Sequence, residues 1–166
     1  MAQKPVVFDI DGTEAVSRVL LNLLNEFPGL GSKKILFSTL SESSGLGFFP
    51  TSGAALLSDD EDITGHVSQK CLYPFEIVYR LSPKTEEHRI RAKELLDGIG
   101  KWLERQPITV NGKSYQLESY PALSSGNRII KSINRTNPSH LYSTYQDGIE
   151  DWVVSAALRY ENNFDR

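Results

Sequence analysis

Two stretches of the chain alternate between apolar and polar residues along most of their length. In residues 67–81 every odd position but one is apolar, and in residues 151–160 the even positions read Trp, Val, Ala, Leu and Tyr. Side chains alternate across a strand with a period of two, so both stretches are predicted to be long, half-buried β-strands. Pro74 has no amide hydrogen to donate, which predicts that the first strand lies at a sheet edge or is bulged there.

Two other stretches repeat apolar residues three or four positions apart, as amphipathic helices do. They span residues 14–27 and 83–105, and the second begins with a Ser82 cap followed by Pro83. The polar face of the second helix, which includes Glu104, is expected to be solvated. The expected buried stripes are Val16, Leu20, Leu23, Leu24 and Phe27 in the first helix, and Ala92, Leu95, Leu96, Ile99, Trp102 and Leu103 in the second.

Shorter strands complete the predicted sheet. Asn111-Gly112 between two apolar runs is a strong hairpin signal and predicts that 108–110 pairs with 114–117. The segments that follow Asn137-Pro138 and precede Phe48 are expected to be loops. Further short strands are expected over 34–40, 54–57 and 128–135, the last with a basic side. The chain is therefore predicted to be one α+β domain over residues 1–166, a mainly antiparallel sheet with two amphipathic helices packed on one face.

Composition narrows the function classes. The chain is 39% hydrophobic and 23% charged with a formal net charge of −3, so it lacks the basic surplus of proteins that bind nucleic acid non-specifically. No apolar stretch approaches the ~20 residues needed to span a bilayer, and no signal-peptide core follows Met1, so we expect neither membrane association nor export. Cys71, the only cysteine, falls on the apolar face of a predicted strand and is expected to be a buried structural thiol.

One motif near the start of the chain points to phosphate chemistry. The sequence VVFDIDGT, which contains Asp9 and Asp11, resembles the first motif of haloacid-dehalogenase-type phosphohydrolases. By that resemblance Asp9 would attack phosphorus, Asp11 would act as general acid and base, and both would bind magnesium. That family needs a parallel, doubly wound sheet with crossover helices, whereas this chain predicts two helices and a second half made of strands and turns.

A simpler interpretation of the same residues is that Asp11 or Thr13 caps the first helix. The acidic run of residues 59–62 lacks the ligand spacing and central glycine of a calcium loop, and is expected to form a solvated turn. We therefore expect no catalytic residue, no metal and no cofactor. The magnesium-dependent phosphohydrolase remains the alternative hypothesis.

A wider resemblance extends over roughly three quarters of the chain. The segments LNLLNEFPGL, GFFPTSGAAL, HVSQKCLYPFEIVYR, KELLDGIGKWLERQP, NGKSYQLESYPAL and DGIEDWVVSAALRYENNF occur in that order. In this series the chain resembles the tail-terminator proteins of long-tailed bacteriophages and prophages, also called minor capsid or tail-completion proteins. The resemblance implies an α+β fold with a mainly antiparallel sheet covered by helices on one face.

The resemblance also implies a structural role in virion assembly. Such a protein forms a ring, usually a hexamer, that terminates the tail tube and meets the head connector. Its partners would be further copies of itself, the tail tube protein and the head-connector protein. It would assemble in the host bacterial cytoplasm and end in the virion tail.

Three groups of residues are candidates for the contacts of such a ring. Two consecutive phenylalanines within a Gly/Ser/Pro-rich segment are unusual for a monomer surface. An acidic run and a basic series on a predicted strand could meet across a head-to-tail interface. The candidates are Phe48 and Phe49; Asp59, Asp60, Glu61 and Asp62; and Arg128, Lys131 and Arg135.

Overall fold

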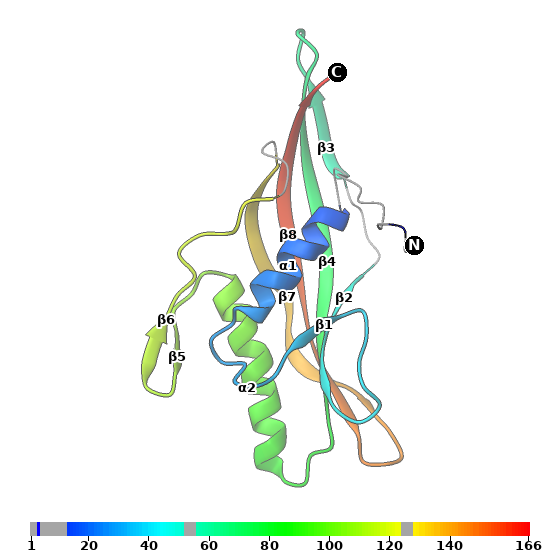
Figure 1. Ribbon diagram of the computed structural model, residues 1–166, viewed down its shortest axis with the longest axis vertical. Helices are drawn as coiled ribbons and strands as arrows, with labels where there is room; N and C mark the ends of the chain where they lie inside the picture. Colours follow the sequence, from blue (N-terminus) through cyan, green and yellow to red (C-terminus); the bar gives the residue numbers. More distant parts are fainter. Residues whose placement is uncertain (1–2, 4–12, 52–55, 124–127) are drawn as a thin grey trace.

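Three long strands run most of the length of the molecule in the computed structural model, which describes residues 3, 13–51, 56–123 and 128–166 (Figure 1). Two helices lie beside them. In chain order the elements are α1 (Thr13–Asn25), β1 (Ile35–Phe37), β2 (Gly45–Pro50), β3 (Leu56–Glu61), β4 (His66–Leu81), α2 (Glu86–Leu103), β5 (Ile108–Val110), β6 (Lys113–Tyr115), β7 (Arg128–Thr144) and β8 (Glu150–Asp165).

The main sheet is built around the pairing of β4 with β8. These strands pair antiparallel over their whole length, from His66 opposite Asp165 to Leu81 opposite Glu150, without a register shift. The strand order is β1-β2-β4-β8-β7, and β3 pairs with β4 beyond the end of β2. Among the strands of the described residues, only β1 and β2 pair in parallel. The predicted α+β fold with a mainly antiparallel sheet is therefore confirmed, as are its two long alternating strands.

Pro74 lies in a central strand, which corrects the prediction of an edge or a bulge. Its carbonyl accepts a hydrogen bond from the Thr51 amide at 3.0 Å. Since the N–H and C=O of one residue in an antiparallel ladder point to the same neighbour, the Pro74 nitrogen faces away from β8. On that side residues 75–80 of β4 pair with β2, and residues 67–71 pair with β3. Pro74 thus occupies the point where the neighbouring strand changes.

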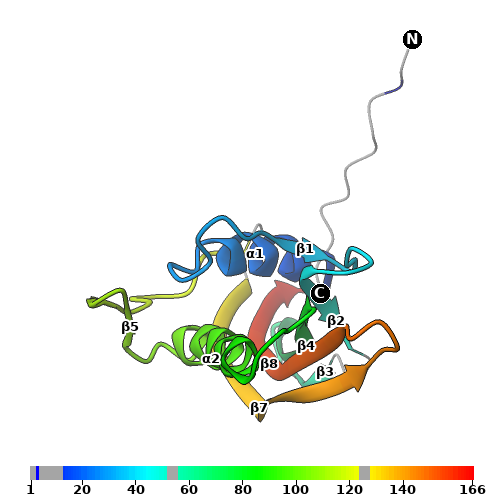
Figure 2. The same cartoon turned by 90° about the horizontal axis from the view of Figure 1, so that it is seen from below.

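Both helices cover one face of the sheet, here called the inner face (Figure 2). The predicted stripes of both helices are buried there, although Leu95 is only partly so. Trp102 of α2 packs edge-on against Phe27, with the ring centroids 5.6 Å apart. The opposite side of β4 and β8 is here called the outer face, and neither helix covers it. The inner-face core includes Tyr73, Phe75, Ile77, Val154, Ala156 and Leu158 from the strands.

The helix ends differ from the prediction for local reasons. α2 begins at Glu86 instead of Pro83, because Thr85 is the cap and its hydroxyl accepts from the His88 amide at 3.3 Å. α1 ends at Asn25, where the side-chain amide donates to the Ile35 carbonyl and its oxygen accepts from the Ile35 amide. That exchange ties the end of α1 to the start of β1.

Several short elements also differ from their predicted form. The strand expected over 34–40 is limited to Ile35–Phe37, because Ser38 takes a left-handed φ of 52°. The acidic residues 59–61 lie within β3 and only Asp62 is in the turn, so the predicted acidic turn is wrong for the first three. β7 continues through Asn137-Pro138 with register shifts instead of ending there. The hairpin at Asn111-Gly112 is confirmed, with positive φ at both residues.

Candidate functional site

Asp9 and Asp11, the residues of the phosphohydrolase alternative, lie outside the described part of the chain. So does Asp11 in its other predicted role as a helix cap. Within the described ranges, no group of three or more His, Cys, Asp or Glu side chains could hold a metal ion. In the same ranges no helix is long and apolar enough to cross a membrane.

The two phenylalanines of the interface prediction have different surroundings. They lie in β2, which begins at Gly45, so the loop predicted before Phe48 is wrong only for residues 45–47. Phe48 points to the inner face and has no exposed surface, with its ring packed edge-on against Phe75 at 5.5 Å. It therefore cannot contact a partner while the subunit is folded, which corrects its assignment as an interface residue. Phe49 is partly exposed on the outer face, opposite Glu76.

The four acids of the interface prediction lie on the hairpin formed by β3 and β4. Asp59 and Glu61 both pair with Arg166, at 3.8 and 2.6 Å. Asp62 accepts hydrogen bonds from the Thr64 and His66 amides and from the Thr64 hydroxyl, and these bonds lower the pKa of its carboxyl. Asp60 is exposed and, among the described residues, forms no ion pair.

The three basic residues predicted as one side of a strand do not form one surface. Arg128 is buried, with 2% of its surface exposed. Lys131 is exposed and lies 3.6 Å from Glu161 of the next strand. Arg135 turns towards α2 and binds Glu104. The register shift between Ile130 and Ser132 places Lys131 out of phase with the other two, which corrects the expectation of a common basic patch.

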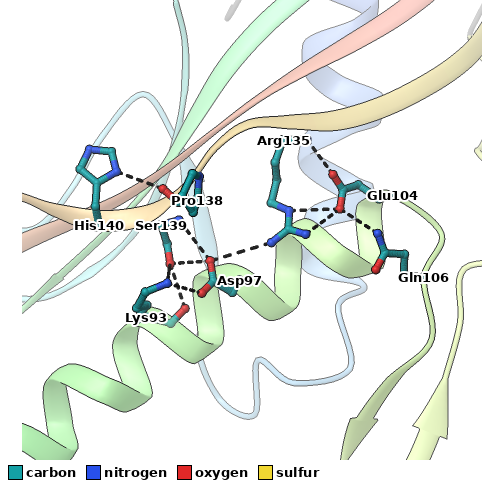
Figure 3. Close-up of polar contacts among 8 residues, drawn as sticks. All are labelled: Lys93, Asp97, Glu104, Gln106, Arg135, Pro138, Ser139 and His140. Carbon is teal, nitrogen blue, oxygen red and sulfur yellow. Dashed lines mark hydrogen bonds and ion pairs between the residues drawn. The ribbon is translucent and has the colours of Figure 1, made fainter.

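A polar cluster joins the second half of α2 to β7, and Figure 3 shows its members. Arg135 donates from Nε and Nη2 to Glu104 Oε1 at 3.1 and 2.8 Å, and its amide donates to Glu104 Oε2 at 2.9 Å. Further along, Asp97 Oδ1 accepts from the Ser139 amide at 3.1 Å and lies 2.6 Å from the Ser139 hydroxyl. Lys93 Nζ donates to Asp97 Oδ2 at 2.7 Å. Glu104 is therefore not a solvated residue, contrary to the prediction.

The electrostatics of this cluster favour a structural role. Burial alone would raise the pKa of Asp97, but the hydrogen bonds from Lys93 and Ser139 outweigh it and hold that pKa below its ordinary value. The serine is buried and its hydroxyl is already bound to a carboxylate. A nucleophilic serine needs a neighbouring base and access to substrate, and Ser139 lacks the access. The cluster thus fastens α2 to β7.

A shallow hollow of about 540 Å³ lies beside this cluster, between α2, β7 and the β5 strand. Its charged lining contains Glu94, Asp97, Lys101 and Arg135, two acids and two bases. The hollow therefore favours neither anions nor cations. Ligand sites usually place a few convergent polar groups in an enclosed apolar pocket, which this open surface is not.

A second hollow, of about 420 Å³, is lined by the end of β4 and the first half of α2, and these two segments lie in the lower part of the molecule in Figure 1. Its lining is mixed, and the apolar part includes Leu81, Ala92 and Leu95. Its rim carries Lys33 and His88 together with Arg91, which pairs with Glu87 at the exposed surface. We call this the basic hollow, with Tyr79 and Ser82 as its remaining lining residues.

The turn between β3 and β4 is a feature that sequence reasoning missed. It projects at the opposite end of the molecule from the basic hollow (Figure 1). Ile63 stands in this turn with its side chain fully exposed, at 104% of the reference surface. The sequence signal was present in Asp62-Ile63-Thr64-Gly65, a turn tetrad with an apolar second residue.

Neither a protein-family model nor a curated protein matches this chain.

Proposed function

We propose that the protein is a structural subunit of virion assembly, a tail-terminator-like protein of a long-tailed bacteriophage or prophage. It forms a ring, a hexamer in the simplest case, that ends the tail tube and binds the head connector. Its partners are copies of itself, the tail tube protein and the head-connector protein. It assembles in the host cytoplasm and remains in the virion tail.

The observation that carries this proposal is the agreement of the sequence resemblance with the fold. The ordered sequence segments resemble tail terminators, and that resemblance implies a mainly antiparallel sheet with helices on one face. The sheet has that form, with α1 and α2 on the inner face only. A sequence resemblance without a catalytic motif gains weight when the fold it implies is the fold observed, since many other layer arrangements exist for a chain of this length.

The outer face offers surface that assembly can cover. Leu72 and Val78 of β4 are only partly buried there, and Ala157 of β8 lies between them and is partly buried too. Charged groups such as Glu76 and Arg159 are interspersed. Interfaces between subunits that are also stable as separate monomers have this mixed character, with apolar groups inside a polar rim.

The proposal is tested by looking for the ring directly. The purified protein is examined by light scattering over a range of concentrations and by negative-stain electron microscopy, alone and with purified tail tubes. Closed rings, or rings at one end of the tubes, are the expected result. A subunit that stays monomeric even with the tubes would overturn the proposal.

The phosphohydrolase alternative has its own direct test, since its residues are known. Magnesium-dependent hydrolysis of a phosphate monoester is measured for the wild type and for Asp9→Asn. We expect no activity above background in either protein. Activity that Asp9→Asn abolishes would replace the structural function with an enzymatic one.

A further inference from the structure

A network of local hydrogen bonds fixes the conformation of the β3–β4 turn, in which Ile63 is exposed to solvent. The Asp62 amide donates to the His66 carbonyl at 2.9 Å, and the Gly65 amide donates to the Asp62 carbonyl at 3.1 Å. Gly65 has a φ of +86°, the left-handed conformation that glycine adopts at no steric cost. Three further bonds to Asp62 Oδ1 complete the turn. Little conformational entropy is therefore left to lose when Ile63 is buried by another surface.

The C-terminal end of β8 fastens this turn from the side. The Arg166 amide donates to the Gly65 carbonyl at 2.8 Å, and its guanidinium reaches Glu61 Oε2 at 2.6 Å. Five carboxylates lie around the exposed isoleucine, four on the hairpin and one at the end of β8, together with His66 and Arg166. The carboxylates are Asp59, Asp60, Glu61 and Asp62 on the hairpin and Asp165 of β8, which lies 3.0 Å from His66 Nδ1.

The hairpin end and the basic hollow have complementary chemistry. One presents a single apolar side chain surrounded by acids. The other combines apolar lining residues such as Leu81 and Leu95 with the cations Lys33 and Arg91, of which Arg91 also pairs with Glu87. Its volume of about 420 Å³ is well above the roughly 150 Å³ cavity that accepts a benzene-sized group in a protein core.

The sheet edges, in contrast, are poor sites for another strand. β7 has four register shifts along its pairing with β8, β1 has three residues, and β3 carries acids at 59–61. Bulges, short length and charge are the devices by which proteins prevent strand addition at edges. A contact between copies of this chain is therefore expected to use other surfaces.

We propose that the β3–β4 turn of one copy docks into the basic hollow of the next copy. Ile63 enters the apolar part of the hollow, while Asp60 and the neighbouring acids face the rim lysine and arginine. This inference rests on the proposed function, self-assembly of the subunit, and names the two surfaces that meet.

The geometry fits a head-to-tail assembly. The two surfaces lie at opposite ends of the long axis (Figure 1), so one copy cannot satisfy its own contact. A contact between two different surfaces is heterologous, and it gives a ring when the rotation between copies closes and an open filament when it does not. Points that touch in such a ring lie at the same height along its axis. The long axis of each subunit is therefore expected to run around the ring rather than along the tail.

Disulfide trapping tests the contact. Ile63→Cys and Ser82→Cys are combined in one chain, because Ser82 is exposed and lines the basic hollow. Cys71, the only native cysteine, is buried. Mild oxidation of the assembled protein is expected to give a ladder of linked subunits on a non-reducing gel. The matched control combines Ile63→Cys with Lys113→Cys, an exposed position on the β5–β6 hairpin, and is expected to give no ladder.

A second measurement tests the energetic role of the isoleucine. Ile63→Asp is expected to raise the Kd of self-association about tenfold or more, because the variant places a charge where the contact buries a branched aliphatic side chain. The control is Ile129→Asp, on β7, where the side chain is half exposed and association should not change. Neither side chain is buried, so both variants should fold.

The outcomes separate this inference from the proposed function. If the wild type assembles but Ile63→Asp assembles equally well, or the two cysteine pairs give equal ladders, the docking contact is wrong and the ring remains. If the wild type never assembles, with or without tail tubes, both fail. The contact is supported if the Ile63→Cys and Ser82→Cys pair gives a ladder and if self-association is weakened in Ile63→Asp but not in Ile129→Asp.

Discussion

Replacement of Gly100 by alanine is expected to destabilise the protein, although alanine is the better helix former. Gly100 is buried in α2 where the Arg135 side chain crosses the helix. A Cβ added at Gly100 would lie 2.8 Å from Arg135 Cγ and closer still to its Cδ. These are atoms in the middle of the side chain, and the guanidinium beyond them is fixed by Glu104. The arginine therefore has to leave its place.

The magnitude follows from two opposing terms. Alanine in place of glycine in a helix interior gains about 1 kcal/mol. Displacement of Arg135 breaks two charge-assisted bonds to Glu104, between side chains that are 22% and 13% exposed. A hydrogen bond to a charged group is worth about 1.5–3 kcal/mol. The Glu104 carboxylate keeps the bond from the Arg135 amide, so the loss is partial, and Gly100→Ala should lower the free energy of unfolding by about 1–2 kcal/mol.

The sign of the effect should depend on the arginine. In an Arg135→Ala background the obstruction is gone, and Gly100→Ala should then stabilise by about 1 kcal/mol. The coupling between the two positions is thus about 2–3 kcal/mol, within the range for residues in direct contact. Gly98→Ala is the matched control, because its Cβ would meet only Phe27 Cζ at an ordinary 3.5 Å. That variant should stabilise in both backgrounds.

Urea unfolding followed by tryptophan fluorescence measures these differences, since small domains usually unfold in one cooperative step. The reasoning is refuted if Gly100→Ala raises the unfolding midpoint in the wild-type background. It is equally refuted if the effect has the same sign and size with and without Arg135.

Three further predictions concern the core and the polar cluster. Trp102→Ala should cost about 3–5 kcal/mol in urea unfolding, because it empties the space beside Phe27. Asp97→Asn should destabilise by about 1–3 kcal/mol at pH 7. Since its pKa is lowered in the folded state, the stability that Asp97 provides is present above the unfolded value of 3.8 and is lost as pH falls through the lowered folded pKa. The difference between the wild-type and Asp97→Asn midpoints should therefore be smaller at pH 3 than at pH 6. Cys71 is buried, and burial raises the pKa of its thiol, so a thiol reagent should modify it only after unfolding.

The sequence predicts best the elements whose pattern and tertiary surroundings agree. The strands β4 and β8 alternate cleanly because one face of each packs on the helices, and a slip of one residue would expose that whole face. The predicted helix stripes succeed for the same reason. Pro74 shows the limit of a local rule. Proline is disfavoured where a strand residue must donate a ladder hydrogen bond, but the tertiary structure places Pro74 in a central strand between the residues that pair with β2 and those that pair with β3.

The turn predicted for the acids of β3 is wrong for residues 59–61 because the strand propensity of a residue has little influence on its conformation in an edge strand. Asp59 and Asp60 are poor strand formers, yet their backbone pairs with a regular neighbouring strand, and their side chains remain in water or reach Arg166. The contacts of the polar cluster were beyond prediction for a different reason. Arg135 and Glu104 lie 31 positions apart and meet only because α2 packs across β7 at one particular height.

β7 shows why a broken pattern can still belong to one strand, and what that means for assembly. Ile130 and Ile133 would lie on opposite faces of a regular strand, yet both are buried on the inner face. The register shift at Lys131 adds one residue between them, restores the common face and sends the lysine into water. A later shift accompanies the turn of Ser139 towards Asp97. The irregularities that complete the core are thus the same ones that spoil this edge for pairing. An edge interrupted in this way is poorly suited to pairing with a strand of another copy, which agrees with a contact made instead through the projecting β3–β4 turn and the basic hollow.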